Sequence, residues 1–386
     1  MAQTLRLAIA APRFWPHVED SPTHLLRLAE SLTDAGHSVT VVTPLWQRAW
    51  PRQMFVGRVS LVRLRGSHRG GLSTVRWMYS LSGWLREQKL DGILAAGLRH
   101  EAYIALGTAQ KTGISVAVLA GEGDLTWQRT ATFGGRIAAR CREAQAIVAP
   151  SRELAETLAF AGYAPQTLTV VSRRVAIPPP RSPQAQTDIR AALAAVNYDL
   201  VTTATAPVAL AVGRLDEPHQ LGDLVRAWRI VGARRSEARL WILGDGPLRD
   251  RLYQQIGDLD QRFRVLIPGM FDSLQEVLQA ADLYLSPAAH LVPPLALLEA
   301  LAAGLPVVSA DAPAIRELAP AEAEGMFVPA GEIQSLAGAI SNHFEHPGPG
   351  IVRASAIRQQ MQAQPTPADE AAAYTELFQR LRAKRS

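Results

Sequence analysis

The chain has 386 residues, more than one compact core usually supports, so we expect two domains. Hydrophobic residues make up 48% of it, and the 19% that are charged are scattered, a composition that excludes a largely disordered protein. The net charge of +5 arises from 40 basic and 35 acidic residues, a surplus too small and too dispersed to predict nucleic-acid binding.

The single cysteine, Cys141, excludes an internal disulfide and a cysteine-based zinc site, and it fits a reducing compartment. The N-terminal apolar run of about seven residues ends at Pro12, and no other window is long enough for a transmembrane helix. We therefore expect a cytoplasmic protein whose contact with the inner membrane surface would be peripheral. The basic, Gly-rich segment 65–76 is the candidate for contact with a membrane or another polyanion, and a solvated loop is the alternative.

The first half of the chain alternates between strand and helix patterns. The first helix is predicted over 22–34, since Ser21 can cap it, Pro22 suits its first turn and Gly36 suits its end. A Pro-rich stretch at 176–186, AIPPPRSPQAQ, predicts a linker. Strands are predicted at 5–10, 38–43, 59–64, 92–95, 116–119 and 146–148.

The second half repeats the alternation, which predicts a parallel sheet in each half with helices on both faces. We expect two Rossmann-like, doubly wound α/β domains at 1–180 and 181–360, with their ligand-binding strand ends toward a central cleft. A helix at 361–386 follows, with Ala372, Leu377, Phe378 and Leu381 toward an apolar side. Strands are predicted at 208–212, 240–243, 263–266, 283–285 and 307–309, and helices start near 221, 247, 273, 294 and 313.

Two turns in the second half combine a strand end with glycine. Gly244 and Gly246 follow one strand, and Pro247 is predicted to open a helix, so backbone amides there can approach a phosphate. The alternative is that a strand-to-helix turn uses glycine for steric reasons alone. Arg214 follows another strand, where a guanidinium can bind a phosphate or pair with Asp216 or Glu217 instead.

The segment LVPPLALLEALAAG, 291–304, places one carboxylate in an apolar helix. Pro293 and Pro294 suit the helix start and Gly304 its end. Glu299 falls near the predicted strand ends, where it can accept two hydrogen bonds from a vicinal diol. Burial without a partner would be costly, so a ligand or a cation must face it.

These segments resemble the family 4 glycosyltransferases of the GT-B fold over nearly the whole chain. The motifs VGRL, LGDGP, ADLYLSP and LLEALAAGLPVVSA, with Glu317, follow the family order, and FWPHVEDSPTHLLRLAESLTDAGHSVTVVT, which includes His24, matches its opening. The resemblance implies a retaining hexosyltransferase of polysaccharide biosynthesis. It would move a sugar from a nucleotide-diphosphate-sugar donor to a glycan or lipid-linked acceptor without metal or other cofactor, and its last helix would return to the first domain. An independent surface helix is the alternative for that last segment.

The resemblance also implies roles for residues of this chain. Arg214 matches the arginine that neutralises the diphosphate, Glu299 the acid that holds the ribose, and the backbone near Gly269 and Met270 the base contact. The implied catalytic residues are Arg214, His219 and Glu122, and the implied donor-binding residues are Gly213, Arg214, Gly244, Gly246, Met270, Leu295 and Glu299.

Several positions depart from the family pattern. His219 replaces a lysine, Gln220 a glycine and Leu291 the first glutamate of a pair, while Glu19 and Asp20 replace two glycines. The family's catalytic histidine has no clear counterpart, although His100 lies near one candidate loop, and the acceptor-side loop carries Glu122, Asp124 and Trp127. The alternative function is therefore a catalytically degenerate relative that serves as a nucleotide-binding or scaffold subunit. A GT-B epimerase or phosphorylase is a third possibility, which the pattern around Glu299 disfavours.

Overall fold

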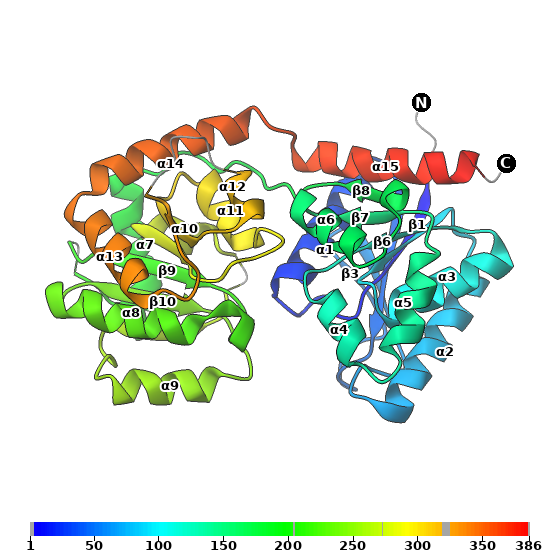
Figure 1. Ribbon diagram of the computed structural model, residues 1–386, viewed down its shortest axis with the longest axis horizontal. Helices are drawn as coiled ribbons and strands as arrows, with labels where there is room; N and C mark the ends of the chain where they lie inside the picture. The colour runs from blue at the N-terminus through cyan, green and yellow to red at the C-terminus, as the bar shows by residue number, and fades with distance from the viewer. Residues whose placement is uncertain (1–3, 204, 272, 319–324, 385–386) are drawn as a thin grey trace. The chain divides into compact units, whose positions relative to one another are not determined.

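The computed structural model describes residues 4–203, 205–271, 273–318 and 325–384, which form two compact units (Figure 1). The first unit comprises Met1–His17, Ser21–Arg174 and Pro365–Ser386, and the second comprises Val18–Asp20 and Val175–Gln364. Each contains one mainly parallel sheet with helices packed on it, so the prediction of two Rossmann-like α/β domains is confirmed.

The centre of the first unit, in the described residues, is an eight-stranded sheet with the order β3-β4-β2-β1-β5-β6-β7-β8. Neighbouring strands are parallel except for β3, which pairs antiparallel with β4. The edge strands β3 and β8 were not predicted, because they are only partly buried and lack the continuous apolar run of the equally short β7. The strands are β1 (Arg6–Ala10), β2 (Ser38–Pro44), β3 (Gln53–Val56), β4 (Val59–Leu64), β5 (Gly92–Ala96), β6 (Ser115–Leu119), β7 (Ile147–Ala149) and β8 (Leu168–Val170).

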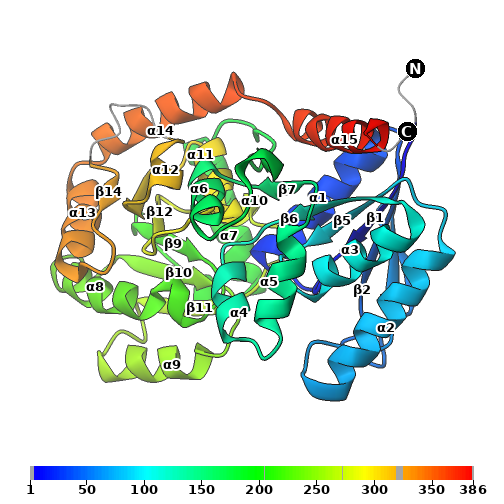
Figure 2. The same cartoon turned by 45° about the vertical axis from the view of Figure 1, so that its right-hand side comes forward.

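Helices connect these strands and pack on the sheet, and α2 and α3 lie side by side (Figure 1 and Figure 2). The first helix begins at Asp20, so the prediction of Ser21 as its cap is wrong; proline is tolerated at Pro22 because the first turn needs no intrahelical N–H bonds. The helices are α1 (Asp20–Asp34), α2 (Gly71–Glu87), α3 (His100–Thr112), α4 (Asp124–Thr130), α5 (Gly134–Arg142), α6 (Arg152–Phe160), the 3-10 turn η1 (Pro165–Thr167) and α15 (Pro367–Ala383).

The C-terminal helix α15 packs in the core of the first unit. Thr366 and Asp369 form a capping box at its start. Leu377, Phe378 and Leu381 are buried as predicted, but Ala372 is exposed. The prediction for Ala372 was wrong because its neighbour Ala371, together with Tyr374, continues the buried face instead.

Burial in the same unit raises the pKa of the Cys141 thiol to about 12, so it stays protonated at neutral pH.

In the described residues of the second unit, a six-stranded parallel sheet has the order β11-β10-β9-β12-β13-β14. The strand predicted at 263–266 instead begins at Val265, and the exposed Phe263 precedes it. The two-residue strand β14 was not predicted. The strands are β9 (Val208–Val212), β10 (Arg239–Leu243), β11 (Val265–Gly269), β12 (Leu283–Ser286), β13 (Val307–Ala310) and β14 (Phe327–Val328).

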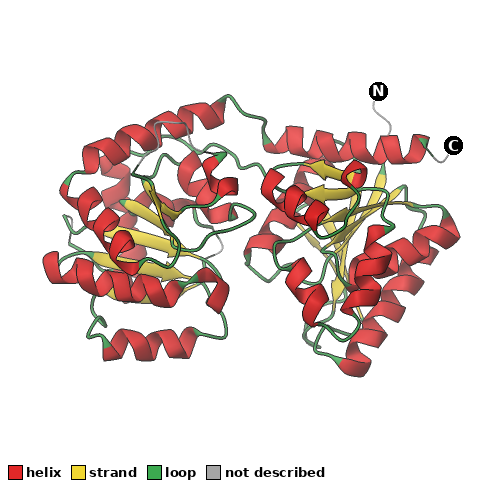
Figure 3. Cartoon of the chain, in the orientation of Figure 1, coloured by secondary structure: helices red, strands yellow, loops and turns green. Residues whose placement is uncertain are grey.

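Helices cover both faces of this sheet, and a separate apolar cluster lies between the sheet and the helices on each face (Figure 3). One face is covered by α8, α9 and α13, and the other by α7, α10 and α11. The helices are α7 (Pro183–Val196), α8 (Leu221–Arg234), α9 (Arg249–Asp258), α10 (Gln275–Ala280), α11 (Leu295–Ala302), α12 (Pro313–Arg316), α13 (Ile333–Glu345) and α14 (Pro347–Gln362), with 3-10 turns η2 (Tyr198–Leu200) and η3 (Glu217–His219).

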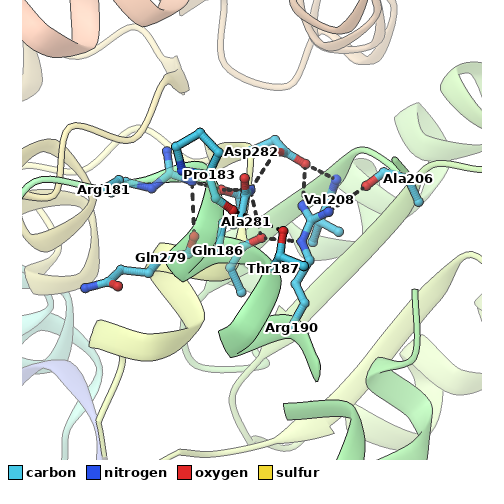
Figure 4. Close-up of polar contacts among 11 residues, drawn as sticks. Arg181, Pro183, Gln186, Thr187, Arg190, Ala206, Val208, Gln279, Ala281 and Asp282 are labelled. Atoms are coloured by element: carbon cyan, nitrogen blue, oxygen red, sulfur yellow. Dashed lines mark hydrogen bonds and ion pairs between the residues drawn. The ribbon is translucent and has the colours of Figure 1, made fainter. Parts of the chain in front are cut away.

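The predicted linker is shorter than its proline content suggested. Ser182 caps α7 and Pro183 is its first residue, so residues 183–186 are helical. Figure 4 shows how α7 is fixed to the sheet: Arg190 Nη2 and Gln186 Nε2 each donate to the Asp282 carboxylate at 2.7 Å. Asp282 also accepts the amide of Val208 at 2.7 Å, so one side chain joins α7 to the starts of β9 and β12.

Within the described ranges, we find no helix with both the length and the hydropathy needed to cross a membrane.

Candidate functional site

Three loops meet at the carboxyl ends of β9, β10 and β11 in the second unit. The amide of Leu215 donates to the carbonyl of Asp245 at 3.1 Å, and the amide of Gly244 donates to the carbonyl of Gly269 at 2.9 Å. Met270 follows β11 with 43% of its surface exposed. The turns that carry Gly213, Gly244 and Gly269 are therefore neighbours, as expected for adjacent parallel strands.

The two glycines after β10 are required by the close approach of these loops. A Cβ at Gly244 would lie 1.9 Å from the carbonyl oxygen of Gly213, and Gly244 has a φ of +150°. A Cβ at Gly246 would lie 2.4 Å from the carbonyl oxygen of Leu215. The steric interpretation of both glycines is thus sufficient by itself. Pro247 does not open a helix, because α9 begins two residues later, at Arg249.

Arg214 follows β9 and pairs with two carboxylates. Its Nε lies 3.1 Å from Asp216 Oδ2 and its Nη1 donates to Glu19 Oε1 at 3.0 Å. Its side chain is 34% exposed, so the guanidinium is accessible but already engaged. The pairing with Asp216 agrees with one predicted alternative, whereas Glu217 pairs with Arg251 at 2.9 Å.

His219 is joined to Arg214 through the same acid. Its Nδ1 lies 2.6 Å from Asp216 Oδ1, and its ring centroid is 5.5 Å from that of His290. The ring also packs on Gly213, where a Cβ would lie 2.8 Å from His219 Cδ2. Asp216 holds both candidate cations. The contact between His290 and His219 was not predicted, since the two residues are 71 positions apart and no local pattern links them.

The start of α11 carries the second anion-binding group. The amide of Leu295 donates to Asp20 Oδ1 at 2.6 Å. In α11, Glu299 is partly exposed, whereas the other residues of this described helix are buried. Burial raises the pKa of Tyr284 far above its usual value, and the negative charges of Glu299 and Asp20 raise it further, which places both acids near this tyrosine.

Two consecutive acids therefore contact two candidate phosphate-binding groups. Glu19 contacts the guanidinium of Arg214 and Asp20 contacts the first amide of α11, and the segment Val18–Asp20 groups with the second unit. Consecutive Cα atoms are about 3.8 Å apart, so the guanidinium and the helix start lie within reach of one dipeptide. The structure thus brings Arg214 and Leu295 together, with Glu299 one turn further along α11. Glu317 is exposed at the end of α12.

Glu122 lies in the first unit, in the loop after β6, and its side chain is exposed. Its neighbour Asp124 is buried: Oδ1 accepts from Arg99 Nε at 2.7 Å and Oδ2 accepts the amides of Leu98 and Gly121. Arg99 lies over the Trp127 ring at 5.5 Å. Asp124 therefore organises this loop, and Glu122 is presented on its surface.

A row of partly exposed rings follows the strand ends of the first unit. We call it the ring row. Neighbouring centroids are 5.0 to 6.3 Å apart, and sequence analysis did not predict the row because its members come from separate loops. In order, the rings are Trp50, His17, Trp46, His68, His100 and Trp127.

A buried acid holds the middle of the ring row. Glu101 Oε1 accepts from Trp77 Nε1 at 2.9 Å and lies 2.7 Å from His68 Nε2. Burial would raise the pKa of Glu101, but the attraction of His68 and the hydrogen bonds lower it overall, so the group is an anion at neutral pH. Among the described residues of both units, no group of three or more His, Cys, Asp or Glu could hold a metal ion.

Two family models match the chain. One, described as "Glycosyltransferase Family 4", matches residues 21–177, and the other, described as "Glycosyl transferases group 1", matches residues 206–346. Together they span the greater part of both units.

Curated relatives agree with these models. The lipopolysaccharide core biosynthesis glycosyltransferase LpsE of Rhizobium meliloti is 33% identical over 141 residues, which are 36% of this chain and 40% of LpsE. The first relatives that the chain matches are aligned over only 33% to 42% of their length. Phosphatidyl-myo-inositol mannosyltransferase of Mycolicibacterium smegmatis is 25% identical over 362 residues, 88% of this chain and 85% of that protein.

A solved structure shares the fold over nearly the whole chain. HepE of Anabaena in complex with UDP and glucose superimposes with a TM-score of 0.78 at 17% identity, covering 97% of this chain and 99% of HepE.

Proposed function

Because the chain belongs to the family 4-type glycosyltransferases with the GT-B fold, we propose that it transfers a hexosyl group from a nucleotide-diphosphate sugar to a glycan or lipid-linked acceptor. In this reaction the bond between the anomeric carbon and the diphosphate oxygen breaks. A bond from that carbon to an acceptor hydroxyl oxygen forms with retention of configuration, and the hydroxyl proton is released. The products are the glycoside and the nucleoside diphosphate.

The observation that carries this proposal is that two consecutive acids, Glu19 and Asp20, contact Arg214 and the first amide of α11. Both groups bind carboxylate oxygens here, at 3.0 Å and 2.6 Å. We propose that two diphosphate oxygens take these places when the donor binds. A guanidinium and a helix N-terminus that are already positioned would then stabilise the charge that develops on the departing diphosphate.

The neighbouring residues suit the rest of the donor. Glu299, one turn into α11, would accept hydrogen bonds from the ribose hydroxyls, and the exposed backbone of Gly269 and Met270 would contact the base. His219, held by Asp216, would add a second cation beside the diphosphate when it is protonated. The contribution of Gly213, Gly244 and Gly246 to donor binding would be steric, since the absence of a side chain at these positions lets the loops around the donor approach each other closely.

The acceptor would bind at the ring row of the first unit. Tryptophan faces pack against the C–H faces of sugar rings, and imidazoles exchange hydrogen bonds with hydroxyls. Glu122, exposed in the adjacent loop, would accept the proton of the acceptor hydroxyl. In this proposal the protein supplies the charge that a metal would otherwise supply, so transfer should persist in EDTA.

Nucleotide binding and turnover test the proposal. We expect UDP or GDP to raise the melting temperature, and a panel of nucleotide sugars to reveal a donor that is hydrolysed or transferred. Arg214→Ala should weaken nucleotide binding about tenfold or more, since a charged hydrogen bond contributes about 1.5–3 kcal/mol. Glu299→Ala should weaken the response to nucleoside diphosphates that carry a ribose.

Arg226→Ala is the matched control, because that arginine pairs with Asp223 on the surface of α8. Binding without turnover for every donor would contradict the transferase and support the scaffold subunit. No response to any nucleotide would contradict both functions.

A further inference from the structure

Helix α2 has one face that anchors it to the first unit. Trp77, Leu81 and Leu85 are fully buried, and Trp77 Nε1 donates to Glu101 of α3. Their spacing of four residues places them on one side of the helix. This face accounts for the packing of α2 on the domain.

The other face of α2 is apolar as well, although it is exposed. Leu72, Val75 and Tyr79 are 88%, 60% and 78% exposed. They recur at i, i+3 and i+7, so they form one stripe, and the exposed Arg76 lies on the same side, four residues after Leu72. Large apolar side chains aligned at this exposure mark an interaction surface rather than part of a core.

The loop before α2 brings more positive charge to this stripe. Gly66 crosses the helix so closely that a Cβ would lie 2.2 Å from the amide nitrogen of Trp77. The amide of Ser67 donates to the carbonyl of Ser73 at 3.2 Å, which fixes the loop to the first turn. Arg65 and Arg69 are exposed on this fixed loop. Residues 65–86 contain four arginines and no acid.

We propose that this surface, formed by Leu72, Val75, Arg76, Tyr79, Arg65 and Arg69, binds the face of an anionic lipid bilayer. The apolar stripe would enter the boundary between headgroups and acyl chains, where tyrosine is favoured, and the arginines would contact lipid phosphates. A second copy of the chain is a poorer occupant, since its own arginines would repel these.

The surface also indicates where the acceptor comes from, an extension that depends on the function proposed above. His68 lies between Arg65 and Arg69 in the same loop and is a member of the ring row. A bilayer bound at α2 would therefore present lipid headgroups beside the ring row. We infer that the acceptor is lipid-linked and is taken from the membrane surface.

Vesicle sedimentation of the full chain tests the surface. The probes are phosphatidylcholine vesicles with and without phosphatidylglycerol. We expect binding to the anionic vesicles that weakens at high salt. A triple variant, Leu72→Ser with Val75→Ser and Tyr79→Ser, and a second, Arg65→Gln with Arg69→Gln and Arg76→Gln, should each reduce the partition coefficient about tenfold or more. Phe160→Ser is the matched control, because Phe160 is 97% exposed on α6 of the same unit.

Equal binding of wild type and both triple variants, or equal binding to neutral and anionic vesicles, would overturn the proposal. So would a dimer in light scattering that the apolar triple variant dissociates, since the stripe would then join two copies. The effect of nucleotide on the melting temperature separates this test from the proposed function. If nucleotide does not raise the melting temperature of the wild type, the proposed transferase is contradicted. If nucleotide raises it but the wild type does not bind vesicles, only the membrane surface is contradicted. Leu72→Ser alone, at a position 88% exposed, replaces the triple variant if the latter does not fold.

Discussion

Arg214 illustrates how strongly a single side chain depends on its partners. The guanidinium lies between Asp216 and Glu19, and Asp216 in turn holds His219. In the proposed function, a donor phosphate would therefore compete with carboxylates that are part of the same chain. Because the pairs are about one-third exposed, the competition is moderate and depends on ionic strength.

Removing the competing charge should improve donor binding. We expect Glu19→Gln to lower the Kd for the nucleoside diphosphate by about twofold to fivefold, since a partly exposed ion pair contributes up to about 1 kcal/mol. Isothermal titration calorimetry measures the change. Glu237→Gln, which removes an acid paired with Arg235 elsewhere on the unit, is the control. Unchanged or weaker binding of Glu19→Gln would show that Glu19 does not occupy the phosphate position.

His100 is a residue through which we expect acid to destabilise the first unit. Burial lowers the pKa of His100, and the nearby positive charges of His68 and Arg99 lower it further, although Glu101 opposes them. Below the unfolded pKa of about 6.5, the unfolded chain binds a proton that the folded form binds only at lower pH, so stability falls as the pH falls and is constant above that range.

We therefore expect the melting temperature to drop between about pH 7.5 and 5.5, and the drop to be smaller in His100→Phe, which cannot take up the proton. Differential scanning calorimetry at several pH values measures both. His346→Phe, at a position outside the first unit, serves as the control. An identical drop in wild type and His100→Phe would rule out His100 as the source.

Among the elements, α7 depends most clearly on one polar network. Asp282 accepts hydrogen bonds from Arg190, Gln186 and the amide of Val208, and Arg190 is 8% exposed. Short helices are marginal by themselves, so this network helps to fix α7 at the start of the sheet. The cation at Arg190 would lose its charged partner if Asp282 were removed.

The variant Asp282→Ala should lower the free energy of unfolding of the second unit by about 2–4 kcal/mol, because it leaves buried donors without their acceptor. Denaturant titration measures the loss. Asp223→Ala, which removes one partner of an exposed pair on α8, should cost less than about 0.5 kcal/mol. Equal effects of the two variants would mean that the network contributes no more than a surface ion pair.

At the scale of the whole molecule, the return of α15 to the first unit connects the end of the chain to its first half. Glu370 Oε1 lies 2.7 Å from His24 Nε2, and Oε2 accepts the amide of Arg174 at 2.8 Å. Phe378 packs where Gly92 leaves space, since a Cβ there would lie 2.5 Å from its ring. The last helix is thus part of the core of the first unit.

Removing this buried acid should affect one unit and leave the other unchanged. We expect Glu370→Ala to lower the stability of the first unit by about 2–4 kcal/mol, with faster hydrogen exchange in α1 and α15. The nucleotide response, proposed for the second unit, should persist. Glu376→Ala, an exposed acid on the same helix, is the control. If Glu370→Ala abolished the nucleotide response as well as destabilising the first unit, the expectation that only the first unit is affected would be contradicted.

The alternation of strands and helices and the apolar faces were predictable from the sequence, because burial imposes periods of about two and 3.6 residues on neighbouring positions. β9 and the start of α8 match their predictions, and Glu299 was recognised because an acid is conspicuous in an apolar helix. The pairs of distant residues that form the candidate donor site and fix the last helix were not predictable. Glu19 and Arg214 are 195 residues apart, and His24 and Glu370 are 346 apart. Such partners meet only when separate strand ends and helices are packed together, and no local period records which side chains will then face each other.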